Sequence, residues 1–125
     1  MAKTKSIQDI KSQLSGFIGT TQYHIHRVPL AGAFKCTDGA MFVANECEAF
    51  WMLDLVASYQ VSPKVAKEPF QVYKFKKTGD SSMLVTIEDG NKNELATQKI
   101  HFTDFPLDEI EMWFIRGVIL LPSEY

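Results

Sequence analysis

The sequence lacks most of the features that would place a protein in a specialised class. Only two of its 125 residues are cysteines, Cys36 and Cys47, which is too few for a disulfide framework. Its most apolar stretch, Met112 to Leu121, contains Arg116 and is much shorter than the roughly 20 residues that span a bilayer. The N-terminal residues carry no apolar run of the kind found in signal peptides. We therefore expect a reduced, cytoplasmic protein that does not bind a membrane.

The sequence also has little excess charge and no familiar catalytic motif. Its formal net charge is −2, which gives no long-range attraction to nucleic acid or to anionic lipid. It contains no phosphate-binding Gly-rich loop, no nucleophile elbow and no zinc-peptidase motif. It also lacks the signatures of zinc fingers and of RNA-recognition domains. The charge therefore argues against a nucleic-acid partner.

The composition that is present is that of an ordinary globular domain. Hydrophobic residues make up 46% of the chain and charged residues 22%. A length of 125 residues suits one domain, and we expect it to span residues 1–125. Nine phenylalanines and four tyrosines favour β-structure.

One helix is expected to organise the rest of the chain. Asn45 with Glu48 three residues later resembles a capping box, in which each side chain satisfies an early backbone N–H group. The segment that follows is apolar on nearly every side, as far as about Gln60. A helix of this kind is normally buried. We therefore predict a buried helix over about 45–60, with Phe50 and Leu53 in the core.

The remaining segments alternate between strand patterns and turns. Helical spacing predicts a short amphipathic helix over Ser6–Ser15, and the sequence Thr37-Asp38-Gly39 is typical of a tight hairpin turn. Strands are predicted over Gly19–Val28, Ala31–Cys36, Ala40–Ala44, Phe70–Lys77, Met83–Glu88, Glu94–Phe102, Ile110–Phe114 and Val118–Leu121. The fold class is α+β: an antiparallel sheet of about five to seven strands, largely a meander, with a short N-terminal helix and one longer buried helix.

His24 and His26 are the strongest candidates for metal ligands. On a strand, alternating residues point to the same face, which places the two imidazoles roughly 6.5 Å apart. Such a pair can bind one zinc or iron ion, although a site needs a third ligand, for which His101 and Asp104 are the candidates. Cupin metal motifs also begin His-x-His, but Pro29 and Leu30 stand where a glutamate would follow. Two half-exposed histidines on a solvated face are the simpler interpretation, and we expect no metal and no cofactor.

The predicted central helix carries further candidate residues. Asp54 belongs to its narrow polar stripe and must reach solvent or a partner, so it is a candidate for ligand binding together with His24, His26 and Trp51. The simpler interpretation is that this stripe is the wet edge of the helix. Trp51 and Leu55 lie on the flank beyond the stripe, and one sheet face cannot cover the whole circumference. We therefore predict a homodimer with Trp51, Leu55 or Trp113 in the contact.

Several segments resemble a known group of proteins. They are Thr37-Asp38-Gly39, Ala49-Phe50-Trp51-Met52-Leu53-Asp54, Asp89-Gly90-Asn91, Thr103-Asp104-Phe105-Pro106 and Leu120-Leu121-Pro122-Ser123-Glu124-Tyr125. In these segments the chain resembles a family of short bacterial proteins of unknown function, over nearly its whole length. The resemblance implies no activity and assigns no functional residue.

Three hypotheses for function follow. The first is a small non-catalytic cytoplasmic binding or adaptor domain that self-associates. The second is a metal-dependent enzyme that uses His24 and His26. The third is a nucleic-acid-associated accessory protein. No sequence feature identifies a small-molecule ligand for any of them.

Overall fold

The computed structural model describes residues 7–20, 22–28 and 32–125. The helices of these residues are α1 (Ile7–Leu14), α2 (Asp38–Glu46), α3 (Phe50–Ser58) and α4 (Pro63–Ala66), with 3₁₀ turns η1 (Tyr59–Val61) and η2 (Pro122–Glu124). The strands are β1 (His24–Val28), β2 (Gly32–Cys36), β3 (Phe70–Lys77), β4 (Met83–Asp89), β5 (Glu94–Ile100), β6 (Glu109–Ile115) and β7 (Val118–Leu120). The predicted short N-terminal helix is confirmed, and its expected cap, Ser6, lies outside the described residues.

The strands of the described residues form one sheet in the order β1-β2-β7-β6-β3-β4-β5. Every neighbouring pair is antiparallel except β2 and β7, which run parallel. The α+β class and the mostly antiparallel sheet are therefore confirmed. The sheet is nevertheless mixed. Strand β6 does not continue the meander beyond β5 but pairs with β3, and it is the middle strand of the sheet.

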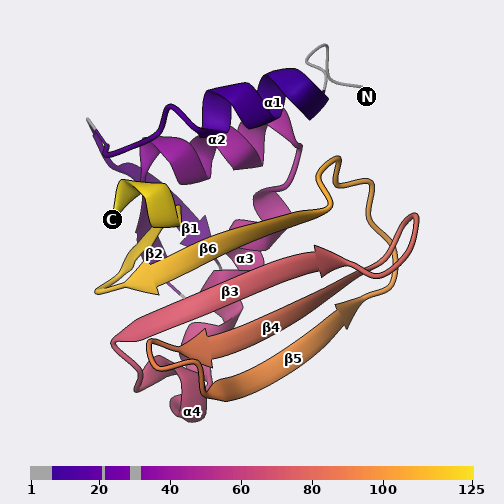
Figure 1. Cartoon of the computed structure of the whole chain (residues 1–125). Coiled ribbons are helices and arrows are strands. Elements are labelled where there is room, and N and C mark those ends of the chain that lie inside the picture. Colours follow the sequence, from indigo (N-terminus) through magenta and orange to yellow (C-terminus); the bar gives the residue numbers. More distant parts are fainter. Residues whose placement is uncertain (1–6, 21, 29–31) are drawn as a thin grey trace.

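The molecule has two layers. Figure 1 shows α3 passing behind β3 and β4, and α1 lying against α2. Phe17, which follows α1, packs its ring against that of Phe42 on α2, with centroids 5.2 Å apart. No helix of the described residues lies in front of β3 and β4 in this view. The sheet therefore has a covered face, which packs against helices, and an open face.

The segment predicted as a turn and a strand over Ala40–Ala44 is helix α2, so this prediction is wrong. Thr37 is its N-cap, with extended backbone, and the Thr37 hydroxyl accepts a hydrogen bond from the backbone N–H of Ala40 at 3.3 Å. Asp38 then provides negative charge in the first turn. Threonine and aspartate favour a helix start as strongly as a turn, and here the apolar face of Ala40 to Ala44 decides for the helix, since it is buried against the sheet.

The single helix predicted over 45–60 is also wrong, because α2 and α3 are separate. Glu48 adopts a left-handed conformation with φ of 50°, and the backbone N–H of Ala49 bonds the carbonyl of Ala44 at 2.9 Å. This is the pattern of a Schellman cap, which ends a helix. Asn45 lies in the last turn of α2, so it cannot cap α3, which begins at Phe50.

The core lies between α2, α3 and the covered face. Tyr73, Phe75 and Met112 are buried there, and Leu53 is fully buried as predicted. Phe50 is 40% exposed, so its prediction as a core residue is wrong. Because α3 starts only at Phe50, that side chain lies at the open end of the helix and not within its packed turns.

A buried polar network fixes the end of α3 to the sheet. Gln71 is buried, and its amide group donates to Gln60 Oε1 at 3.0 Å and to the carbonyl of Val65 at 2.9 Å. The Tyr73 hydroxyl donates to Gln71 Oε1 at 2.6 Å. Burial raises the pKa of Tyr73 above its ordinary value. Because each of these polar groups has a partner, the network holds η1 and α4 against β3 without leaving a buried side-chain donor or acceptor unpaired.

Candidate functional site

His24 and His26 point to the covered face of the sheet. Their neighbours Ile25 and Arg27 point to the open face. His24 Nε2 lies 2.9 Å from Asp38 Oδ1, at the N-terminus of α2. The backbone N–H of Asp38 donates to the Thr20 hydroxyl at 3.0 Å. The first histidine therefore joins the edge of the sheet to the start of α2.

The second histidine makes an equivalent contact with α3. His26 Nε2 lies 2.6 Å from Asp54 Oδ1, and the His26 ring lies 6.0 Å from that of Phe50. Asp54, a candidate binding residue, thus finds its partner on β1, while its side chain remains 56% exposed. Each histidine is held by a different carboxylate, so the pair acts as two links between β1 and the helices.

The third candidate ligand, His101, lies far from this pair. It follows β5, which is the edge strand opposite β1 in the sheet order. Within the part of the chain that the structure describes, no group of three or more His, Cys, Asp or Glu residues has the geometry to hold a metal ion. The structure therefore does not bring His101 together with His24 and His26.

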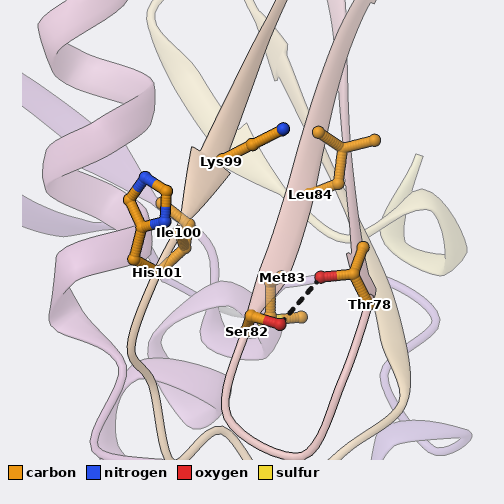
Figure 2. A pocket seen from close by; sticks show the side chains of 7 residues that line it. All are labelled: Thr78, Ser82, Met83, Leu84, Lys99, Ile100 and His101. Carbon is orange, nitrogen blue, oxygen red and sulfur yellow. Dashed lines mark hydrogen bonds between the residues drawn. The ribbon is translucent and has the colours of Figure 1, made fainter.

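His101 instead lines a hollow of about 430 Å³ where β4 begins and β5 ends. Figure 2 shows its lining, in which Lys99 and His101 extend from opposite sides of the β5 ribbon. The hydroxyls of Thr78 and Ser82 lie 2.9 Å apart and bond each other. The remaining lining is apolar and is formed by Met83, Leu84 and Ile100.

The two cysteines are both buried. Burial raises the pKa of the Cys36 thiol from an ordinary 9.0 to about 11. A thiol with this pKa is protonated at neutral pH, and the thiolate is the reactive form. Cys36 therefore serves as a small core residue of β2.

Trp51 and Leu55, candidates for an interface, pack within their own chain. Leu55 is buried. Trp51 is partly buried, and its ring meets that of Phe75 edge-on with centroids 5.9 Å apart. Leu55 has little surface left to offer a partner, and the part of Trp51 that faces Phe75 is already covered.

Trp113, the other interface candidate, lies on the open face. Register places it beside Val72 on β3 and beside Leu120 on β7. The adjacent row across the sheet pairs Phe70 with Ile115, Ile115 with Val118, Val118 with Lys35, and Lys35 with Ile25. We call these apolar residues, with the two tyrosines beside them, the apolar zone: Tyr23, Ile25, Phe70, Val72, Trp113, Ile115, Val118, Leu120 and Tyr125.

Three rings form the centre of the apolar zone. The centroids of Phe70 and Trp113 are 4.9 Å apart, and that of Tyr125 lies 5.4 Å from Trp113 and 5.8 Å from Phe70. Trp113 Nε1 donates to Glu111 Oε2 at 2.6 Å, which satisfies its only donor. The indole is thus fixed in orientation, with Tyr125 exposed above it.

Arg116 stands beside these rings. Together with Ile115 and Tyr125 it lines two hollows, of about 300 Å³ towards Tyr23 and about 360 Å³ towards Phe70. Among the described residues Arg116 has no ion-pair partner. Its guanidinium is therefore available to a group from outside the chain.

Contacts from Glu124 position the C-terminal segment on this face. Its carboxylate accepts hydrogen bonds from the Thr37 hydroxyl at 2.5 Å, from the Gly39 N–H at 2.9 Å and from the Leu121 N–H at 3.0 Å. A Cβ atom on Gly39 would lie 2.5 Å from the Glu124 carboxylate, so a larger residue there would displace this side chain from its hydrogen bonds. The bonds tie η2 to the start of α2 and thereby hold Tyr125 beside Trp113.

Sequence reasoning found Trp113 but missed its neighbours. Arg116 and Gly117 both have positive φ, of 51° and 82°, which is the conformation of a two-residue hairpin turn. An Arg-Gly pair between two strand patterns was a usable signal for that turn. The signal did not reveal that Tyr125 and Phe70 would join Trp113, because those contacts cross the sheet.

No helix among the described residues has both the length and the apolar character needed to cross a membrane. Comparison with curated proteins finds no match, and comparison with solved structures finds none. Residues 8–125 match the model of a family described as a family of unknown function, DUF6876. The match covers nearly the whole chain and confirms the resemblance to an uncharacterised family, so the chain belongs to DUF6876.

Proposed function

We propose that this protein is a small, non-catalytic cytoplasmic binding domain that self-associates through the apolar zone of its open sheet face. The observation that carries the proposal is the cluster of Phe70, Trp113 and Tyr125 on the sheet face opposite α2 and α3. Exposed apolar side chains grouped on one face are typical of an interaction site.

The exposed fractions within the apolar zone support this proposal. Tyr23 is 55% exposed, Ile25 is 54% exposed and Tyr125 is 76% exposed. Tryptophan and tyrosine are among the residues most often found at the energetic centre of protein interfaces. Here Trp113 and Tyr125 lie together, with Arg116 beside Tyr125 and aliphatic side chains around them. A homodimer is the commonest assembly that covers such a face.

The test is the molar mass in solution, measured by light scattering across a dilution series. We expect a concentration-dependent rise from 14.2 kDa towards twice the monomer mass. Ile25→Lys places a charge on the exposed edge of the apolar zone and should shift this transition to higher concentration. Phe102→Lys is the matched control, because Phe102 is 85% exposed and lies after β5, outside the zone.

Two results would contradict the proposal. One is a 14.2 kDa species at every concentration for the native sequence. The other is an equal effect of Ile25→Lys and Phe102→Lys, since that would place the contact elsewhere. Circular dichroism of both variants distinguishes lost association from lost folding.

A further inference from the structure

The charges around the apolar zone indicate how two copies of the chain are arranged. Glu109 and Glu111 lie on β6 before Trp113, on the open face, and Arg116 follows β6 at the opposite end. Strand β6 is also the middle strand of the seven in the sheet. Trp113 is therefore close to the centre of the open face. Along β6 itself, acidic groups precede Trp113 and a basic group follows it, while Lys74 and Lys76 on β3 stand beside Glu111 and Glu109.

Two open faces can meet about a two-fold axis in two simple ways. If the axis runs along β6, each residue of that strand faces its own copy, so Glu111 meets Glu111 and Arg116 meets Arg116. Like charges placed opposite each other weaken an interface. If the axis runs across the strands at Trp113, the two copies of β6 are antiparallel, and residues after Trp113 face residues before it.

The second arrangement pairs opposite charges. Arg116 is three residues after Trp113, whereas Glu111 and Glu109 are two and four residues before it. An axis at Trp113 therefore places each Arg116 between Glu111 and Glu109 of the second copy. Packed sheets lie about 10 Å apart, a gap that an arginine and a glutamate reaching from opposite sides span.

We propose that the partner is a second copy of the chain, bound about a two-fold axis that crosses the strands at Trp113. In this dimer Arg116 faces Glu111 and Glu109 of the second copy. The arrangement rests on the self-association proposed above. This arrangement gives the Arg116 guanidinium a partner that its own chain does not supply. It also stacks the two ring clusters at the centre and leaves the charged pairs at the rim. Such rim pairs determine register and specificity more than affinity.

Charge reversal tests this arrangement. We expect Arg116→Glu to raise the dimer dissociation constant by at least about tenfold, because it places like charges together. Glu111→Arg alone should weaken the dimer in the same direction, and the double variant should recover most of the native affinity. Lys99→Glu is the control, since Lys99 lies on the exposed edge strand β5, away from the zone.

The outcomes separate this inference from the function on which it rests. A native dimer that neither reversal weakens would overturn the two-fold arrangement while leaving self-association in place. A dimer that both reversals weaken without rescue in the double variant would also overturn it, because Arg116 and Glu111 would then each contact a different group. The axis along β6 predicts instead that neither reversal weakens the dimer, since each reversal leaves like charges facing each other. A native chain that stays monomeric would overturn the proposed function, and with it this arrangement.

Arg116→Lys, which keeps the charge, should leave the dimer dissociation constant within about threefold of the native value, since rim pairs depend mainly on charge.

Discussion

The two faces of the sheet use their aromatic residues differently. On the covered face, Tyr73 and Phe75 are fully enclosed, and the tyrosine hydroxyl is bonded within the chain. On the open face, Trp113 and Phe70 pack beside Tyr125, which is largely exposed. Both faces are rich in apolar side chains, but only one has helices to bury them. The comparison shows that alternating apolar residues in a strand do not by themselves identify which face is the core.

The faces also differ in how charge is handled. On the covered face, His24 and His26 each contact a carboxylate from a helix, so Nε2 of each ring has a partner within the chain. On the open face, Arg116 has no such partner among the described residues. The covered face is therefore complete by itself, whereas the open face has both apolar and charged groups to offer. The predictions below test this difference.

The largest expected difference is between substitutions in the two faces. Leu53→Ala on the covered face should lower the free energy of unfolding by about 2–5 kcal/mol, because it leaves a cavity in a packed core. Ile25→Ala on the open face should change it by no more than about 0.5 kcal/mol in the monomer. Urea denaturation at low protein concentration measures both. Equal losses would show that the open face is part of the core.

The buried polar network of the covered face should rank next. Gln71→Leu should cost about 1–3 kcal/mol, because it removes the acceptor of the buried Tyr73 hydroxyl proton and the donor to Gln60 Oε1. Gln98→Leu is a suitable comparison, since Gln98 lies on β5 and bonds only the exposed Tyr59 hydroxyl. The thermal unfolding midpoint of the Gln71→Leu variant should therefore be clearly lower than that of the Gln98→Leu variant. A neutral Gln71→Leu would mean that the network does not hold β3 to α4.

The position of the helix cap can be tested in the same way. Thr37→Ala should cost about 0.5–2 kcal/mol, because Thr37 caps α2 and also donates to Glu124. The sequence pattern alone would instead assign the helix cap to Asn45. Asn45→Ala should lower the free energy of unfolding by less than Thr37→Ala does, since Asn45 is exposed near the end of α2. Chemical denaturation of both variants checks the order. The reverse order would restore the capping-box interpretation.

Alkaline pH should weaken the covered face selectively. Burial raises the pKa of Cys36 from 9.0 to about 11, so the folded protein holds this proton more tightly than the unfolded chain does. The contribution is fully present below pH 9 and is lost as the pH rises from 9 towards 11. Tyr73, whose pKa burial also raises, acts in the same direction. Denaturation midpoints of native and Cys36→Ala protein should fall with pH at different rates, more steeply for the native chain.

The smallest expected effect concerns metal. Because each histidine of β1 already contacts an aspartate and His101 lies at the opposite edge, we expect no stoichiometric transition metal after purification without an affinity tag. Elemental analysis measures this directly. About one zinc or iron per chain, lost in His24→Ala but kept in His101→Ala, would contradict the prediction and favour a metal-dependent enzyme.

Local patterns in the sequence predicted many of the elements. The strands predicted over Phe70–Lys77 and Met83–Glu88 match β3 and β4 nearly residue for residue, since each pattern is bounded by turn residues. The helical spacing of Ile7, Ile10 and Leu14 likewise gave α1. In these segments short-range chemistry suffices, because a turn and a period of two or of 3.6 belong to neighbouring residues.

The sequence by itself determined the class of the fold and the later strands. It also showed that the chain has more apolar residues than the packing of one helix on a sheet can bury. Tertiary structure alone decided that Thr37 begins a helix, since its partner Glu124 lies 87 residues away. It also decided that β7 pairs with β2, and that Trp113 faces outward with Phe70 and Tyr125. The physical reason is that a period of two divides the side chains of a strand between two faces but does not indicate which face is buried. Only the packing of distant segments determines which face the helices cover.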